Sequence, residues 1–314
     1  MSAESNCQAV MLLGFGGPDT AADVRPFLER VLSGRAIPHS RYEEVVRHYE
    51  LLGGKSPYNE ITSRQAQALQ EKLELMGLPV PVVVGFLHAR PFIYDALSEL
   101  KDKAIGRALG FVLAPHRCEA SWDRYWRSVK SASDRLGPDS PHVQSLPPWH
   151  NSPLFVAAVA DRVRAAFERL GQGSPEQLKL IFTAHSIPLA MAGRASYVEQ
   201  LNESARLVAE QLGIKSWTLA YQSRSGNPRE PWLEPDVRDV VRAAAGTSVV
   251  IVPIGFTCDH VEVLYDLDIE TAKVAREAGV TMVRAETVGE HPKFIEMLAT
   301  MSAPYLSRSP QEPS

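Results

Sequence analysis

Short apolar runs alternate along most of the chain with segments whose apolar residues follow a helical spacing. Runs of about four to eight residues that are rich in Val, Ile and Leu and end in Gly, Pro or polar residues predict buried β-strands. Segments in which apolar residues recur every three to four positions predict amphipathic helices. Strands are expected at 9–13, 80–86, 109–113, 142–146, 178–183, 216–220, 248–252 and 281–283, and helices from near residue 20 and at 41–52, 63–76, 91–100, 119–132, 152–170, 197–212, 235–244, 268–278 and 292–301.

This alternation of strands and helices predicts an α/β fold with parallel, doubly wound sheets. The alternation starts again after the proline-rich passage Pro147-Pro148-Trp149, which we interpret as a boundary or hinge, or else as a rigid loop. We therefore predict two similar Rossmann-like lobes, over residues 1–147 and 148–306, with the last helix packing back on the first lobe. Residues 307–314 are rich in Ser and Pro, and we expect a disordered tail there.

Composition and charge narrow the classes of function. The 314 residues are 45% hydrophobic and 22% charged, with a net charge of -4, and no basic cluster of the kind that binds nucleic acid stands out. No apolar run reaches the roughly 18 to 20 residues of a membrane-spanning helix, and the N-terminus lacks the pattern of a signal peptide. We therefore expect a cytoplasmic protein. The oligomeric state stays open, with a monomer as the expectation.

Cysteine usage excludes two kinds of metal centre. Cys7, Cys118 and Cys258 lie far apart in the sequence, and no Cys-x-x-Cys pair is present. Three cysteines are too few for a four-cysteine iron–sulfur cluster, and their spacing does not fit a structural zinc site. We expect three reduced thiols.

The first expected strand runs into the turn Gly14-Phe15-Gly16-Gly17-Pro18, and a helical segment follows. A strand, a glycine turn and a helix in this order can cradle a phosphate group. This turn lacks the last glycine of the dinucleotide-binding pattern, and Pro18 stands where the turn must end. Nucleotide binding is therefore an alternative that the spacing disfavours.

The stretch from Pro253 to Glu270 follows an expected strand and takes on helical spacing after Gly255. Glu262, Asp266 and Glu270 recur every fourth residue, which places three carboxylates on one helix face. Such a row of like charges destabilises a helix unless a cation, a basic neighbour or water compensates it. Spacing alone favours the simplest alternative, a solvated acidic face.

Polar residues gather at the carboxyl ends of the expected strands, where open α/β sheets bind their ligands. His185-Ser186 follows one strand, Gln222-Ser223 follows the next, and Glu262 comes after a third. A neutral imidazole that faces a carboxylate can bind a divalent metal or accept a proton. The alternative is a hydrogen-bonded structural histidine beside a serine that caps a helix. The nucleophile elbow Gly-x-Ser-x-Gly is absent around Ser186, so the His-Ser pair does not indicate a hydrolase.

Several motifs, in the same order along nearly the whole chain, resemble the ferrochelatase family, whose members insert ferrous iron into a porphyrin. The resemblance extends from the first glycine turn to the last helix. It implies a two-lobed, chelatase-like fold and a lyase activity that metallates a porphyrin. Its most specific motifs are Gly53-Gly54-Lys55-Ser56-Pro57, Leu113-Ala114-Pro115-His116, Thr183-Ala184-His185-Ser186-Ile187-Pro188, Gln222-Ser223, Pro231-Trp232-Leu233 with Pro235-Asp236, Pro253-Ile254-Gly255-Phe256 and Asp259-His260-Val261-Glu262.

By this resemblance His185 stands at the position of the family's active-site histidine and Glu262 at that of its partner glutamate. Both are expected to be catalytic and to meet the metal, coming from separate sheet edges across a gap between the lobes. Asp266 and Glu270 match an acidic row that in the family leads outward as an iron path or a proton exit, so the resemblance reverses the preference for a solvated face. Ferrous iron is the substrate metal, no organic cofactor is required, and the cleft is expected to bend the macrocycle.

Further residues are expected to contact the porphyrin. Phe15 stands where some relatives have a tyrosine that ligates iron, so it should pack on the macrocycle without coordinating the metal. Leu87, beside His88, stands where relatives often carry a basic residue. Arg35 and Lys55 either supply positive charge for the propionates or have ordinary surface roles. The expected substrate-binding residues are Phe15, Arg35, Ser56, His88, Tyr125, Gln222 and Trp232.

The segment between Gly34 and Tyr49 is too short for the long apolar lip of membrane-associated relatives that use protoporphyrin IX. It is similar to the compact type associated with coproporphyrin III, which we therefore favour as the substrate, with protoporphyrin IX as the other candidate. Two alternatives stay open: a chelatase for another metal or tetrapyrrole, and a porphyrin- or haem-binding carrier without turnover. The presence of both His185 and Glu262 argues against the carrier.

Overall fold

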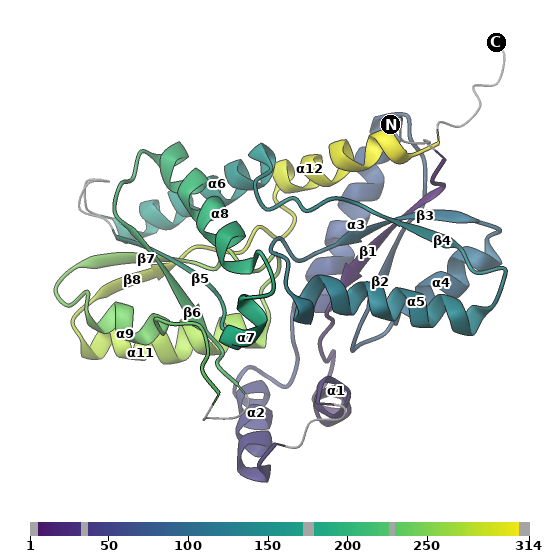
Figure 1. Ribbon diagram of the computed structural model, residues 1–314. Coiled ribbons are helices and arrows are strands. Elements are labelled where there is room, and N and C mark those ends of the chain that lie inside the picture. Colours follow the sequence, from purple (N-terminus) through teal and green to yellow (C-terminus); the bar gives the residue numbers. More distant parts are fainter. Residues whose placement is uncertain (1–5, 33–36, 172–178, 226–229, 308–314) are drawn as a thin grey trace.

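The computed structural model describes residues 6–32, 37–171, 179–225 and 230–307. Its strands form two four-stranded parallel sheets that lie side by side (Figure 1), so the predicted α/β fold with two doubly wound lobes is confirmed. The strands are β1 Ala9–Gly14, β2 Val82–Phe86, β3 Arg107–Val112, β4 His142–Ser145, β5 Lys179–His185, β6 Trp217–Gln222, β7 Ser248–Val252 and β8 Thr281–Arg284. The α-helices are α1 Val24–Val31, α2 His39–Leu51, α3 Tyr58–Leu75, α4 Ile93–Asp102, α5 Arg124–Leu136, α6 Pro153–Leu170, α7 Leu189–Ala192, α8 Tyr197–Leu212, α9 Val237–Arg242, α10 Val261–Val263, α11 Ala272–Glu277 and α12 Pro292–Ser302.

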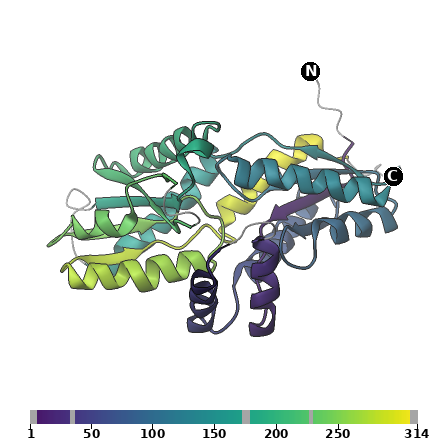
Figure 2. The ribbon, with the colours of Figure 1, turned by 60° about the horizontal axis from the view of Figure 1, so that its bottom comes forward.

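The two sheets share one strand order. The N-terminal sheet runs β2-β1-β3-β4 and the C-terminal sheet runs β6-β5-β7-β8, so the second half repeats the connectivity of the first. In each sheet the first strand of the half lies in the interior. All six residues of β1 are buried, which explains its unbroken apolar run, because a central parallel strand is covered by helices on both faces. In the C-terminal lobe α6 and α8 cover one face of the sheet, and α9 and α11 cover the other (Figures 1 and 2).

Two strands of the C-terminal sheet run further than the pattern predicted. β5 ends at His185 and β6 ends at Gln222, and these two residues are directly opposite each other in the ladder. The backbone N–H of Ser186 donates to the carbonyl of Gln222 at 2.8 Å, which continues the pairing. His185 and Gln222 therefore sit on the last rungs of the sheet and not on loops beyond it, so their backbones are held by strand pairing.

The acidic stretch is helical, but not a regular α-helix. It begins as α10, passes into a π-helical segment over Leu264–Thr271 and continues as α11. The Thr271 hydroxyl donates to the Asp266 carbonyl, five residues earlier, at 2.6 Å. A second π-helical segment, Glu119–Asp123, precedes α5. Short π-helical turns are uncommon and occur frequently at functional sites.

The lobes meet in a continuous aromatic core around Trp149. This side chain is 1% exposed, and its ring centroid lies 5.9 Å from Phe111, 5.1 Å from Phe155 and 5.7 Å from Phe294. The indole N–H donates to the Val112 carbonyl at 3.1 Å. The passage around Trp149 is thus packed as a rigid loop, because moving it would expose this core. The lobe boundary at residue 147 itself stays a prediction.

The last helix, α12, crosses from the C-terminal lobe to the N-terminal one and packs against both α6 and α3 (Figure 1). The chain then returns to its own beginning, since the Cys7 N–H donates to the Tyr305 carbonyl at 3.0 Å and the Ser307 N–H donates to the Cys7 carbonyl at 2.9 Å. The expected disordered tail lies, from residue 308 onward, outside the described residues.

The hairpin of α1 and α2 stands apart from both sheets, beneath the junction of the lobes (Figures 1 and 2). Its apolar side chains form a small core of their own, which includes Phe27, Val46 and Tyr49, together with Val261 from the start of α10. Part of the N-terminal half therefore lies against the segment that carries Glu262. Within the described residues, no helix is both long and apolar enough to cross a membrane.

Candidate active site

His185 and Glu262 are brought together at the carboxyl edge of the C-terminal sheet. His185 ends β5, Glu262 lies on α10 after β7, and β5 and β7 are neighbouring strands. The imidazole Nε2 lies 3.6 Å from the Glu262 Oε2. The expectation that the two groups come from separate sheet edges across an interlobe gap was wrong, because both belong to one sheet. Their side chains are 30% and 52% exposed, so the pair is accessible from outside.

A close backbone approach at Gly255 makes this geometry possible. The Gly255 N–H donates to the Thr183 carbonyl at 3.1 Å. A Cβ at Gly255 would lie 2.9 Å from the Ala184 Cα, inside the contact distance of real side chains. Only glycine lets the loop after β7 pass this near to the end of β5, and the loop then delivers Glu262 to His185.

Hydrogen bonds from neighbouring residues orient both partners. The His185 Nδ1 pairs with the Ser186 carbonyl, so Nδ1 carries a proton and Nε2 faces Glu262. The Tyr197 hydroxyl donates to the His185 carbonyl at 3.0 Å, and the Gln222 side-chain amide donates to the Glu262 carbonyl at 3.3 Å. The pair is thereby fixed from α8 and from β6.

The pair is ionised at neutral pH. Burial by itself would lower the pKa of His185, but the charge of Glu262 and its hydrogen bond outweigh burial and raise it. Burial would likewise raise the pKa of Glu262, and the His185 charge outweighs it and holds that pKa low. We expected a neutral imidazole from the sequence, whereas the structure favours an imidazolium facing a carboxylate. The imidazole must therefore lose a proton before it can accept one.

Asp266 lies deeper along the acidic row and has the properties of a proton carrier. Burial raises its pKa to about 7, with added repulsion from Glu262 and Glu270, although a hydrogen bond from Ser223 acts in the opposite direction. The Ser223 hydroxyl donates to the Asp266 Oδ2. Ser223 itself has a positive φ of 61°, a conformation that non-glycine residues rarely adopt and that is frequent at functional sites.

Glu270 forms the outer end of the row. Its Oε2 lies 3.4 Å from the Arg238 Nη1, and Arg238 also pairs with Asp236 at 2.7 Å. A basic neighbour thus compensates one of the three carboxylates. Along the row, Glu262 pairs with His185, Asp266 has a pKa of about 7, and Glu270 pairs with Arg238 at the surface.

The expected porphyrin contacts on the N-terminal side lie around His88. Its ring packs 4.7 Å from Phe15 and 6.2 Å from Phe27. Burial, together with the charges of Arg124 and Arg30, lowers the pKa of His88 to about 3. Its Nε2 is buried without a hydrogen-bond partner among the described residues. His88 is therefore a neutral histidine with one buried ring nitrogen that no described residue satisfies.

The other expected contacts lie in different surroundings. Ser56 is buried and accepts a hydrogen bond from the Tyr58 N–H at 3.3 Å, and Tyr125 is 4% exposed. Trp232 pairs with Pro188, just beyond His185, and its indole N–H is buried without a partner among the described residues. Arg35 lies outside the described residues. The contact of these residues with a porphyrin stays a prediction.

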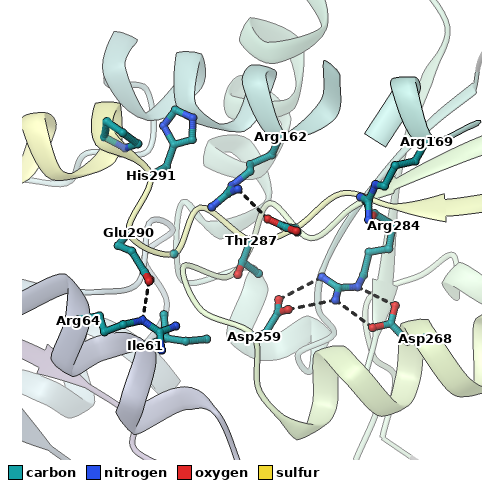
Figure 3. Close-up of a pocket in the computed structure, with 13 residues that line it drawn as sticks. Ile61, Arg64, Arg162, Arg169, Asp259, Asp268, Arg284, Thr287, Glu290 and His291 are labelled. Carbon is teal, nitrogen blue, oxygen red and sulfur yellow. Dashed lines mark hydrogen bonds and ion pairs between the residues drawn. The ribbon is translucent and has the colours of Figure 1, made fainter. Parts of the chain in front are cut away.

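A polar cavity of about 580 Å³ lies beside this site and is shown in Figure 3. It is lined from both halves of the chain, by α3, α6, the end of β8 and the loop before α12. Neither His185 nor Glu262 lines it, but Asp259 and Asp268, which lie on either side of Glu262 and Asp266 in the chain, both do. The pair of His185 and Glu262 thus lies at the carboxyl edge of the sheet, outside the lining of this cavity.

Iron ligands were expected at His185, Glu262, Asp266 and Glu270. In the described part of the chain, no group of three or more His, Cys, Asp or Glu side chains is placed to hold a metal ion. The three cysteines are buried free thiols. The role of the four residues toward iron stays a prediction.

Reasoning from sequence missed two residues that support the site. Tyr197 binds the His185 backbone from the start of α8, and Arg284 pairs with Asp259. Ser223, which the motif Gln222-Ser223 had singled out, binds Asp266. Arg284 ends the last strand, so the rule that strand ends carry the chemistry could have found it. Tyr197 left no such signal, because it acts through its hydroxyl on a residue 12 positions earlier.

Comparison with known proteins identifies the family. A family model described as Ferrochelatase matches residues 7–305. A ferrochelatase from Rhodopirellula baltica is 41% identical over 308 residues, which are 97% of this chain and 88% of the relative. A coproporphyrin III ferrochelatase from Mycolicibacterium smegmatis is 39% identical over 299 residues, 93% of this chain and 88% of the relative. The structure of SirB from Bacillus subtilis with Fe3+ shares the fold, with a TM-score of 0.59 at 14% identity over 96% of each chain. The chain belongs to the ferrochelatase family.

Proposed function

We propose that this protein inserts ferrous iron into a porphyrin in haem biosynthesis, with coproporphyrin III as the preferred substrate. The observation that carries the proposal is the 3.6 Å pair of His185 and Glu262 at the accessible edge of a chelatase-like sheet. Family membership and the activities named for its relatives support the same reaction. Metallation requires a group that takes two pyrrole protons and a weak ligand for the incoming metal, and this pair can supply both.

The acidic row of Glu262, Asp266 and Glu270 provides a route by which the pyrrole protons reach solvent. Two N–H protons leave the porphyrin as one Fe²⁺ enters, so the net charge within the porphyrin core is the same before and after insertion. In the ligand-free protein the imidazole of His185 already holds a proton, and this proton must leave toward Asp266 before the imidazole can accept one from a pyrrole nitrogen. A carboxyl with a pKa of about 7 exchanges this proton with water near neutral pH. Each turnover uses the route twice.

In this scheme iron is a substrate that binds transiently, and it is not a permanently bound cofactor. Imidazole nitrogen and carboxylate oxygen bind ferrous iron less tightly than a cage of thiolates binds softer metals. Two ligands leave most of the coordination sphere to water and to the porphyrin nitrogens. His185 and Glu262 therefore hold the metal long enough to present it and weakly enough to release it.

The preference for coproporphyrin III rests on charge and on relatives. This porphyrin carries four propionates, and Arg30 and Arg124 lie close enough to His88 to lower its pKa. These two arginines stand near the position where Leu87 lacks the basic side chain of many relatives. The relatives named as coproporphyrin III ferrochelatases reach 39% identity in Mycolicibacterium smegmatis and 40% in Mycobacterium leprae. We also propose that the protein acts in the cytoplasm.

The test is an anaerobic insertion assay with coproporphyrin III and with protoporphyrin IX, each at matched concentration with ferrous iron. Catalytic conversion of the free-porphyrin absorption spectrum to the metallated one supports the activity, and a higher kcat/KM for coproporphyrin III supports the substrate. The same assay with cobalt or zinc in place of iron distinguishes a ferrochelatase from a chelatase for another metal, which would insert its own metal faster than iron. A stoichiometric spectral change without turnover would instead indicate a porphyrin-binding carrier.

A further inference from the structure

A buried arginine anchors the segment that carries the acidic row. Arg284 ends β8, and its side chain is 11% exposed. Its Nη1 and Nη2 donate to the two carboxylate oxygens of Asp259, each at 3.1 Å. Its Nε and Nη2 donate to the two oxygens of Asp268 at 2.7 and 2.9 Å (Figure 3). One guanidinium thus forms a double fork between two carboxylates.

These contacts satisfy the guanidinium almost completely. Nη1 also donates to the Ala285 carbonyl at 3.2 Å, so every nitrogen of the group has a partner. The Asp259 carboxylate is partly buried, with a side chain that is 21% exposed, whereas the Asp268 side chain is 38% exposed and lies at the surface. Bidentate pairs of this kind fix relative orientation as well as contributing energy, unlike single exposed ion pairs.

The two partners of Arg284 enclose the active-site carboxylates. Asp259 lies three residues before Glu262, and Asp268 lies two residues after Asp266. Arg284 comes from a different strand and holds both ends of this stretch. The stretch includes an uncommon π-helical segment, and the Arg284 guanidinium ties its two ends to the end of β8.

We propose that Arg284 is a positioning residue for iron insertion, which holds Glu262 and Asp266 in register with His185 through its fork to Asp259 and Asp268. This inference rests on the proposed function. Arg284 touches neither partner of the 3.6 Å pair, so it acts through the backbone of the 259–268 stretch. Displacement of a catalytic group by about 1 Å can lower a rate by about a hundredfold. The position of Glu262 relative to His185 is therefore the quantity that Arg284 controls.

The first test compares Arg284→Gln with Arg284→Lys in the full-length protein, under the anaerobic assay with coproporphyrin III. We expect Arg284→Gln to lower kcat at least tenfold while KM for the porphyrin changes less than threefold. Arg284→Lys should restore part of kcat, because a lysine can pair with only one of the two carboxylates. Equal kcat values for Arg284→Gln and wild type would overturn the inference.

A matched control removes another arginine of the same cavity. Arg162 on α6 pairs with Glu286 at 2.7 Å (Figure 3). It also donates to the Val288 carbonyl at 3.2 Å. These contacts of Arg162 do not involve residues 259–268. Arg162→Gln should lower the melting temperature comparably and leave kcat within about twofold of wild type. If both variants lose kcat in proportion to their stability, Arg284 has only a structural role and the inference fails.

A second measurement locates the effect. Hydrogen exchange of the Arg284→Gln variant should accelerate in residues 260–271 and leave the amides of β5 unchanged. The double variant with Asp268→Asn should be no slower in kcat than Arg284→Gln alone, because both changes break the same fork. Additive losses, or exchange that accelerates evenly over the chain, would contradict the inference. A wild-type protein that does not metallate porphyrin refutes the proposed function, whereas active wild type with an unaffected Arg284→Gln refutes this inference alone.

Discussion

Replacing Asp266 by asparagine should stabilise the protein at high pH. Asparagine keeps the shape of the side chain and can still accept the hydrogen bond from the Ser223 hydroxyl, but it cannot ionise. The pKa of Asp266 is raised from 3.8 to about 7, mainly by burial. The folded protein therefore binds more protons than the unfolded chain between these values, and the stability of wild type falls as pH rises through this window.

The expected magnitude follows from the shift. A difference of about 3 pH units corresponds to an upper bound of about 4 kcal/mol at pH 8. Partial exposure and relaxation reduce this figure, so we expect Asp266→Asn to be more stable than wild type by about 1–3 kcal/mol at pH 8. At pH 4 wild-type Asp266 is protonated in the folded state and nearly half protonated in the unfolded chain, so the two proteins should differ little.

The assay is urea unfolding of both proteins at pH 4, 6 and 8, followed by circular dichroism and tryptophan fluorescence. Asp239→Asn serves as the control, because it removes one carboxylate from an exposed position on α9. A stability difference between Asp266→Asn and wild type that stays constant from pH 4 to pH 8 would refute the raised pKa. In the insertion assay Asp266→Asn should retain partial activity, and its rate should lose the dependence on a group that titrates near pH 7.

Three further substitutions test the geometry of the site. His185→Ala should lower kcat at least a hundredfold, with unchanged far-ultraviolet circular dichroism; wild-type turnover in this variant would exclude the site. Gly255→Ala places a Cβ 2.9 Å from the Ala184 Cα and should cost about 1–3 kcal/mol of stability, together with a loss of kcat; thermal unfolding at wild-type temperature would contradict the close approach. Gln222→Ala removes the donor to the Glu262 carbonyl and should cost about 1 kcal/mol and lower kcat severalfold, whereas an unchanged kcat would show that this hydrogen bond does not position Glu262.

Much of the architecture was predictable from local pattern. The strands of both sheets and most helices lie within a few residues of the predicted ranges, because buried parallel strands and amphipathic helices each impose a period on the sequence. The motifs around His185 and Glu262 pointed to the family, which the comparisons confirm. The search at strand ends singled out His185 and Glu262, and the structure brings these two side chains together, because parallel strands deliver their carboxyl ends to one edge.

The sequence alone determined the order of the elements, the α/β class and the family, and it led to the proposal that His185 and Glu262 carry the chemistry. Only the tertiary structure decided that His185 and Glu262 belong to neighbouring strands of one sheet, that the imidazole is protonated, and that Asp266 titrates near neutrality. It also revealed the fork of Arg284, whose partners lie 25 and 16 positions earlier in the chain. The physical reason is that periodicity and motifs are properties of neighbouring residues, whereas desolvation and ion pairing depend on groups that folding alone brings together.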